Sequence, residues 1–317
     1  MGEPINRLNP QVESSVQRIL FVHAIKLLTS IAMLFPKKEH TKRGQRPYDY
    51  RVVLVLCILR ILLLKTYATY EIEMRTDMRI CTLLGLSFLP GKSTIQRAMQ
   101  SLSMKMILEF NRMLLADFLQ RKVNLALDAS GMRIVGRSIW YSIRIKKEII
   151  RREFDKVHIA IGLDVLFVFN WRISDGKRHD SPFFRLLIAP IELLGLVLAD
   201  RGYSSRANVQ LVANRKGAAF IPFKKNATGR SKSKPAWKML FWIWDRFKTI
   251  FENIYHQRSK IESVFHALKQ RYGEELHCKT KGMRRKEMAL RFIAYNTRLF
   301  ISWHYAVQSG LNLYVRA

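Results

Sequence analysis

Apolar residues recur at three- and four-residue intervals through the first 120 positions, and this period predicts helices. The clearest case is the segment 11–35, where four aliphatic side chains share one face: Leu20, Ile25, Leu28 and Ile31. Two further helices are predicted at about 48–65 and 75–84, and a polar, basic stretch at 37–47 separates the first two helices. We therefore expect a helical N-terminal region.

The next segment predicts a turn followed by a capped helix. A Pro-Gly pair at 90–91 predicts a turn, and Ser93 with Gln96 has capping-box spacing for a helix that begins at Thr94. Two helices joined in this way resemble a helix-turn-helix, with Arg97 as a DNA-contact candidate on the second helix. Many helical hairpins only pack together, so both interpretations stay open.

Strand patterns replace the helical period from Asn124 onward. Strands are predicted in six segments: 123–130, 138–145, 157–165, 166–174, 194–200 and 218–223. The third and fourth segments read as a hairpin with Asp164 near its turn. Helices are predicted at 181–191, 204–216, 245–272 and 287–305, and Gly273 ends the third of them. This order predicts an α/β fold in which helices flank a mixed sheet.

The length of 317 residues allows one large domain and a smaller one. We expect a helical region at 1–120 and an α/β domain at 121–310, with a short basic insertion around 224–244. The net charge of +31 predicts a polyanionic partner, most simply DNA or RNA. A generally basic or ribosome-associated protein is the alternative.

Cysteine spacing and hydropathy indicate in which compartment the protein works. The three cysteines lack CxxC spacing, which indicates a reducing compartment without disulfides or a zinc site. No signal peptide is visible, and the apolar run 52–64 contains Arg60 and is too short to span a bilayer. We predict no membrane association.

Two basic segments, 224–238 and 279–286, contain no acidic residue and are predicted to be loops that contact a nucleic-acid backbone. Lys224, Lys225 and Arg230 are the candidates in the first segment. Trp242 lies in the tryptophan-rich stretch that follows and could stack on a base. The alternatives are that the loops are only solvated and that the tryptophans belong to the core.

Three acidic residues carry the candidate chemistry. Asp128 lies within the first predicted strand, Asp200 ends a later buried strand, and Glu262 lies on the long helix. Carboxylates from three distant segments can converge over a sheet, and Mg²⁺ prefers such oxygen ligands. Two Mg²⁺ ions held in this way can promote attack on a phosphodiester. The alternatives are that Asp128 caps a turn, Asp200 pairs with Arg201, and Glu262 is a solvated helix residue.

The long helix also carries a narrow polar stripe. At about 100° per residue, four side chains fall within roughly 60° of one another: Tyr255, Arg258, Glu262 and Lys269. Ile254, Ile261, Val264, Phe265 and Leu268 supply the adjoining apolar arc. An ion pair between Glu262 and Arg258 at i−4 is the simpler interpretation.

These residues together resemble a known family. The chain looks like a DDE transposase of a prokaryotic insertion sequence, which has an RNase H-like catalytic domain. The match rests on Asp128 in LDAS, on Asp200 in ADRGYSS and on the pattern Y-(2)-R-(3)-E-(6)-K from Tyr255 to Lys269. The segment KRHDSPFF at 177–184 also resembles a segment of such enzymes.

The resemblance implies roles for these residues. Asp128, Asp200 and Glu262 would hold two Mg²⁺ ions, for which Mn²⁺ could substitute. Tyr255, Arg258 and Lys269 would grip DNA phosphates. Asp180, in the KRHDSPFF segment, is a candidate behind the metal ligands. Water would free a 3′-OH at the transposon end, and the 3′-OH would attack target DNA.

The resemblance also implies partners and leaves alternatives. The expected partners are the terminal inverted repeats and target DNA, held by a dimer, without a small-molecule substrate. The expected location is the cytoplasm, on the nucleoid.

The interval of 62 residues between Asp200 and Glu262 has no room for the large insertion of some relatives, which leaves hairpin processing open. A silent DNA-binding derivative, a nuclease that only hydrolyses and a structural RNA-binding protein are the alternatives.

Overall fold

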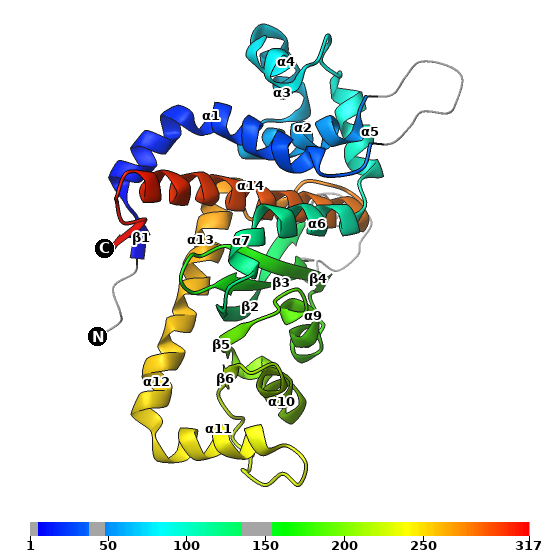
Figure 1. The fold of residues 1–317 in the computed structure, drawn as a ribbon. Coiled ribbons are helices and arrows are strands. Elements are labelled where there is room, and N and C mark those ends of the chain that lie inside the picture. Colours follow the sequence, from blue (N-terminus) through cyan, green and yellow to red (C-terminus); the bar gives the residue numbers. More distant parts are fainter. Residues whose placement is uncertain (1–5, 38–47, 135–153, 317) are drawn as a thin grey trace. The chain divides into compact units, whose positions relative to one another are not determined.

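The computed structural model describes residues 6–37, 48–134 and 154–316, and these form two compact units (Figure 1). The sheet unit comprises 115–277, and the helical unit comprises 4–114 together with 278–317. The sequence suggested a boundary near residue 120 and assigned the last helix to the α/β domain, whereas the units divide at 114/115 and place that helix with the N-terminal ones. The strand predicted at 138–145 lies outside the described residues.

The helical unit is built from helices of both ends of the chain. Its elements are α1 (Pro10–Met33), α2 (Tyr50–Leu62), α3 (Tyr67–Thr76), α4 (Arg79–Leu84), α5 (Lys92–Ser101), α6 (Met104–Leu114), α14 (Lys281–Gln308) and the antiparallel strands β1 (Asn6–Leu8) and β8 (Tyr314–Arg316). α1, α2 and α14 pack against one another. Nearly every apolar residue of α2 is buried there, which explains its continuous hydrophobic sequence.

The first helix is long and apolar enough to cross a membrane by length and composition. Buried core helices meet the same criterion, and α1 buries one face from Val12 to Ala32 inside the helical unit. The helix predicted at 11–35 is therefore confirmed as a helix, with its apolar face in the core of this unit.

Two predictions about the N-terminal helices are wrong. α5 starts at Lys92 after Gly91, which makes no side-chain cap, so Ser93 and Gln96 form no capping box. The helix predicted at 75–84 is interrupted because Asp77 adopts an extended conformation between α3 and α4.

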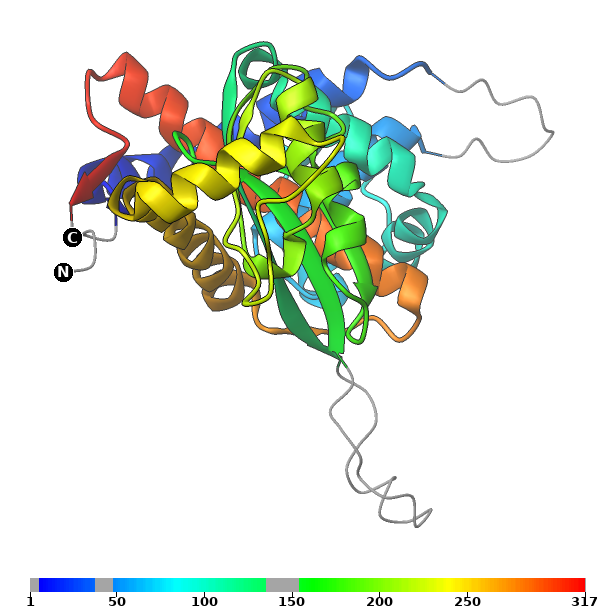
Figure 2. The ribbon, with the colours of Figure 1, turned by 90° about the horizontal axis from the view of Figure 1, so that it is seen from below.

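A six-stranded mixed sheet is the core of the sheet unit. Its strands are β2 (Val123–Ile134), β3 (Phe154–Gly162), β4 (Val168–Asp175), β5 (Leu194–Ala199), β6 (Ala218–Phe220) and β7 (Glu275–Leu276). The order is β4-β3-β2-β5-β6, with β7 beside β2. The first three strands are antiparallel and the next two are parallel to β2, an RNase H-like order that confirms the predicted fold. Figure 2 shows β2 and β3 as a long paired ribbon.

Helices cover this sheet. They are α7 (Ala116–Leu119), η1 (Ser181–Phe183), α9 (Phe184–Ile188), η2 (Arg201–Tyr203), α10 (Arg206–Asn214), α11 (Pro235–Arg246), α12 (Lys248–His256), η3 (Gln257–Ser259) and α13 (Lys260–Tyr272). In Figure 1 the strands lie between α12 and α13 on one side and α9 and α10 on the other. The predicted hairpin is confirmed, and Asp164 lies in the connection between β3 and β4.

The segment predicted as one helix at 245–272 is helical over most of its length, but the prediction of a continuous helix is wrong. Phe247 leaves helical geometry (φ −125°, ψ 50°) and divides α11 from α12, and the 3₁₀ turn η3 separates α12 from α13. The predicted loop at 279–286 is also wrong, since Thr280 caps α14 and residues 281–286 form its first turns. Gly273 does end α13, with a φ of 81°.

Candidate active site

Strand register brings the two aspartates together. Leu127 of β2 pairs in parallel with Ala199 of β5, so Asp128 and Asp200 occupy the next position on neighbouring strands. Adjacent strands are about 4.8 Å apart, which places the two carboxylates side by side at this edge of the strands. Asp200 leaves β5 in an extended conformation and begins the 3₁₀ turn η2.

Arg258 connects the third acidic residue to the first. Its Nη1 donates to Asp128 Oδ2 at 2.9 Å, and its Nη2 donates to Glu262 Oε1 at 2.9 Å. One guanidinium from η3 therefore joins a carboxylate of β2 and a carboxylate of α13. The Arg258 side chain is 19% exposed and that of Glu262 is 62% exposed, so the ion pair with Glu262 faces solvent on one side.

Electrostatics at the site follow from burial and from these contacts. Burial raises the pKa of Asp128, and the Asp200 carboxylate adds to that rise, while the Ala129 amide and Arg258 oppose it. The Ala129 N–H donates to Asp128 Oδ1 at 2.8 Å, which fixes this carboxylate at both oxygens. Burial alone lowers the pKa of Arg258, but the neighbouring Tyr255 and carboxylates raise it above its ordinary value.

Tyr255 and Lys269 complete the predicted stripe. The Tyr255 ring lies 5.8 Å from the Arg258 guanidinium carbon, and burial raises the pKa of its phenol. Lys269 is half-buried two turns beyond Glu262 on α13. The structure thus brings Tyr255, Arg258 and Glu262 together with the aspartates, although the 3₁₀ turn at η3 breaks the regular period on which the stripe was predicted.

The donor set fits a divalent ion in chemistry, since three carboxylates provide hard oxygen ligands. Two of these donors, Asp128 and Asp200, lie at adjacent positions on neighbouring strands. Among the described residues, however, no group of three His, Cys, Asp or Glu side chains lies close enough together to hold a metal. Arg258 lies between Asp128 and Glu262, so a three-carboxylate site requires this guanidinium to release both oxygens.

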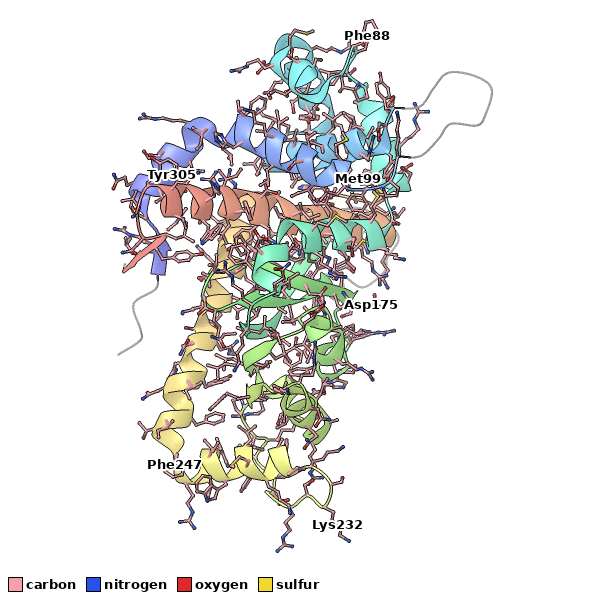
Figure 3. The ribbon with its side chains drawn as sticks, in the orientation of Figure 1. Phe88, Met99, Asp175, Lys232, Phe247 and Tyr305 are labelled. Carbon is pink, nitrogen blue, oxygen red and sulfur yellow. The ribbon has the colours of Figure 1, made fainter. Side chains whose placement is uncertain are left out.

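The other candidates are spread over the sheet unit and the helical unit. Arg97, Lys224, Lys225 and Arg230 are exposed. Figure 3 shows Lys232 at the tip of the basic loop before α11 and Phe247 at the corner between α11 and α12. Trp237 is 5% exposed and belongs to the core, whereas Trp242 is 51% exposed with its ring 4.9 Å from that of Phe247. The core interpretation is therefore confirmed for Trp237, and Trp242 stays a candidate for stacking on a base.

Sequence reasoning missed Lys156 and assigned His158 no role. The two alternate on β3, so they share one face of the strand, and both approach Asp180. The signal was a lysine and a histidine two residues apart on one face of a strand whose C-terminal half is apolar.

The strand order and the converging carboxylates define an RNase H-like domain with an acidic site. The family described as "Transposase DDE domain" matches residues 120–297, more than half of the chain and a range that includes all three acids. The chain belongs to this family of DDE transposases.

Wider comparisons add little. No curated protein matches the sequence. A solved structure, the piggyBac transposase synaptic complex with hairpin DNA, is similar at 8% sequence identity and a TM-score of 0.45, over 93% of this chain and 74% of that chain. A likeness at this score supports no conclusion about function.

Proposed function

We propose that this chain is a metal-dependent DNA transposase that frees a 3′-OH at the end of an insertion sequence and joins it to target DNA. The observation that carries the proposal is that Arg258 bonds to both Asp128 and Glu262, and that Asp128 and Asp200 lie on neighbouring strands, within a transposase DDE domain. Expected partners are the inverted repeats and the target duplex, held by a dimer on the nucleoid in the cytoplasm.

Asp128, Asp200 and Glu262 would hold two Mg²⁺ ions, with Mn²⁺ as a substitute. When bound, such ions activate the attacking oxygen and stabilise the leaving oxygen of a phosphodiester. Asp128 is pre-oriented because the Ala129 N–H fixes one of its oxygens. Glu262 is exposed enough to change rotamer when Arg258 releases it.

The cationic and aromatic residues would bind DNA. Arg258 has a planar fork that suits a phosphate as well as a carboxylate, so it can pass from Glu262 to the backbone of the cleaved strand. Tyr255 and Lys269 flank it. Exposed Lys224, Lys225 and Arg230 would contact phosphates further along, and Arg97 of α5 would contact the transposon end. Exposed Trp242 is free to stack on an unpaired base.

The reaction would proceed in two balanced displacements. Water attacks the phosphodiester at the transposon end, which yields a 3′-OH and a 5′-phosphate. The 3′-OH then attacks a target phosphodiester and displaces a target 3′-OH. One phosphodiester bond replaces another in the second step, so no nucleotide cofactor is consumed.

The test combines a labelled fragment that carries the element's own end, a supercoiled target and Mg²⁺. We expect joined product from wild type and none from Glu262→Gln or Asp128→Asn, a loss of at least a hundredfold. Asp164→Asn, at an exposed aspartate in the β3–β4 connection, is the matched control and should join normally.

Other outcomes identify the alternatives. Cleavage without joining by wild type would indicate a nuclease that only hydrolyses. Equal DNA binding by wild type and Glu262→Gln, without cleavage by either, would overturn the enzymatic proposal and leave a DNA-binding protein.

A further inference from the structure

A polar cluster lies behind the turn that carries Asp200, and the proposed reaction does not use it. The Asp180 cluster consists of Lys156 and His158 from β3, Asp180 at the start of η1, and Tyr203 at the end of η2. Its members come from three separate segments. The charged carboxylate of Asp180 therefore lies against the turn at 201–203 that follows Asp200.

Asp180 is held by both β3 residues. Its Oδ1 lies 2.5 Å from Lys156 Nζ and 3.5 Å from His158 Nδ1. Burial lowers the pKa of His158 to about 4, so the imidazole is neutral near pH 7 and the ion pair is that of Lys156 with Asp180. The Asp180 side chain is only 21% exposed, which makes this pair stronger than one in open solvent.

The same carboxylate packs against the turn after Asp200. A Cβ built on Gly202 would lie 3.0 Å from Asp180 Oδ2, so the carboxylate fills the space that any side chain at 202 would need. Gly202 and Asp180 are therefore in direct contact. The glycine in the ADRGYSS motif is explained by this close approach, since its φ lies outside the left-handed region.

Tyr203 anchors the other end of the turn. Its side chain is fully buried, and its hydroxyl lies 3.4 Å from His158 Nδ1. The other ring nitrogen of His158 lies 2.9 Å from Ser174 Oγ on β4. Phe183 stacks on the imidazole at a centroid distance of 4.1 Å. The histidine thus links β3, β4, η1 and η2.

One asparagine ties the two 3₁₀ turns together. Asn208 Nδ2 donates to Tyr203 O at 2.8 Å and to Ser181 Oγ at 3.1 Å. η1 and η2 are consequently clamped to one another as well as to β3. Asp200 immediately precedes η2, so its backbone position depends on this clamp.

We propose that Asp180 is a positioning residue, which holds the 201–203 turn against β3 and so sets the position of the Asp200 carboxylate. The proposal rests on the proposed function, in which Asp200 holds metal. A carboxylate that supports a ligand from behind typically changes metal affinity or activity by roughly ten- to a hundredfold when removed. A merely structural aspartate would instead change stability and leave chemistry per folded molecule unaltered.

The test compares Asp180→Asn with wild type. Asparagine keeps the shape but loses the charge that holds Lys156. Asp175→Asn is the matched control, because Asp175 is an exposed aspartate at the end of the neighbouring strand β4 (Figure 3). The first readout is amide hydrogen exchange over residues 196–206. It follows the bonds from Tyr203 N to Asp200 O and from Ser204 N to Arg201 O.

The second readout is single-turnover cleavage of the transposon end at saturating protein, with the Kd for that DNA measured separately. For Asp180→Asn we expect exchange in 196–206 to be at least tenfold faster and cleavage roughly ten- to a hundredfold slower. The DNA Kd should stay within about twofold, because none of the residues of the Asp180 cluster is among the proposed DNA contacts. Asp175→Asn should match wild type in all three measurements.

A second variant reaches the same turn without a change of charge. Gly202→Ala places a methyl group against Asp180 Oδ2 and must displace either the turn or the carboxylate. It should reproduce the faster exchange and slower cleavage with the Lys156 pair intact. This variant keeps the test decisive if Asp180→Asn folds poorly.

Two results would count against the proposal, and a third would count against the proposed function instead. Unchanged exchange in both variants would show that Asp180 does not hold the turn. Faster exchange with unchanged cleavage would show that the turn's position does not matter for Asp200. If wild type neither cleaves nor joins, the proposed function fails, and the exchange data alone still decide whether Asp180 clamps the turn.

Discussion

Arg258 forms charged hydrogen bonds with two of the three acids, and those oxygens are the ones a divalent ion would use. In the proposed function, metal coordination by these carboxylates would therefore compete with the Arg258 bridge. By thermodynamic linkage, a DNA phosphate that draws Arg258 away would favour metal binding, and bound metal would free Arg258 for DNA.

We expect Arg258→Gln to bind Mn²⁺ roughly three- to tenfold more tightly than wild type without DNA, because a competing cation is removed. The variant should bind end DNA more weakly. Isothermal titration of Mn²⁺ measures the first effect. Arg246→Gln, at an exposed arginine on α11, is the control and should not alter Mn²⁺ affinity. Equal or weaker Mn²⁺ binding by Arg258→Gln would refute the competition.

The buried His158 gives the sheet unit a defined pH dependence. Burial lowers its pKa to about 4, from about 6.5 in an unfolded chain, so the folded state favours the neutral ring. This contribution to stability is complete above pH 6.5 and is lost as the pH falls from about 6.5 to 4.

His158→Gln should therefore flatten the stability profile between pH 6.5 and 4, where wild type loses up to roughly 3 kcal/mol through this group. Urea unfolding followed by tryptophan fluorescence reports mainly the sheet unit, since five of the six tryptophans lie between residues 140 and 244. His179→Gln, at an exposed neighbour, should retain the wild-type slope. A slope unchanged by His158→Gln would show that other groups dominate.

At the scale of elements, the segment from Lys248 to Tyr272 shows which features the spacing of apolar residues predicts and which it does not. The apolar arc Ile261, Val264, Phe265 and Leu268 is buried as predicted. The 3₁₀ turn at η3 was not predictable, because Gln257, Arg258 and Ser259 carry no helix-breaking signal. The tighter turn coincides with Arg258 bonding to both Asp128 and Glu262, a tertiary contact that local sequence does not contain.

Gly273 ends α13 with φ 81° and ψ 156°, a region that side chains other than glycine avoid. Gly273→Ala should therefore lower the free energy of unfolding by about 1–3 kcal/mol. Gly282→Ala is the matched control in the first turn of α14, where nothing lies within 4 Å of an added Cβ. That change should stabilise by about 0.5–1 kcal/mol. Urea unfolding followed by circular dichroism measures both, and equal effects would contradict the strain at 273.

The strands and their acids were more predictable than the helices around them. Asp128 and Asp200 stand out because charge interrupts or ends continuous apolar runs. Their adjacency follows from parallel pairing of β2 and β5, which the alternating element order predicts. The Asp180 cluster was not predictable as a cluster, since its members on different segments are more than 20 residues apart and meet only through strand register and the packing of η1 on η2.

At the scale of the whole molecule, the net charge is +31, and the lysines and arginines differ in whether acidic residues lie near them. Many arginines and lysines of the helical unit bond to acids, as Arg75 does with Glu71 and Arg79 with Asp77. The loop 224–234 has five cations and no acid in its sequence. This loop is therefore a stronger candidate for phosphate contacts than overall charge alone would indicate.

Neutralising four exposed cations of this loop should weaken DNA binding and reduce its salt dependence: Lys224, Lys225, Arg230 and Lys232 to Gln. Each phosphate contact contributes about 0.9 to the slope of log K against log salt, so a decrease of about 3–4 is expected. Fluorescence anisotropy across a KCl series measures the slope. Four ion-paired cations changed to Gln serve as the control of equal charge: Lys65, Arg75, Arg79 and Arg112. Equal salt-dependence slopes for the two sets of substitutions would show that the loop does not contact DNA phosphates specifically.

The grouping of α14 with the N-terminal helices has a consequence for how the protein is made. During synthesis the ribosome releases α1 and α2 first, then all of the sheet unit, and only afterwards α14, which packs against both helices. At about 5–20 residues per second, the 166 residues between Leu114 and Lys281 take roughly 8–33 s. For that time the apolar surface of α1 and α2 that α14 covers in the folded protein stays exposed on the nascent chain.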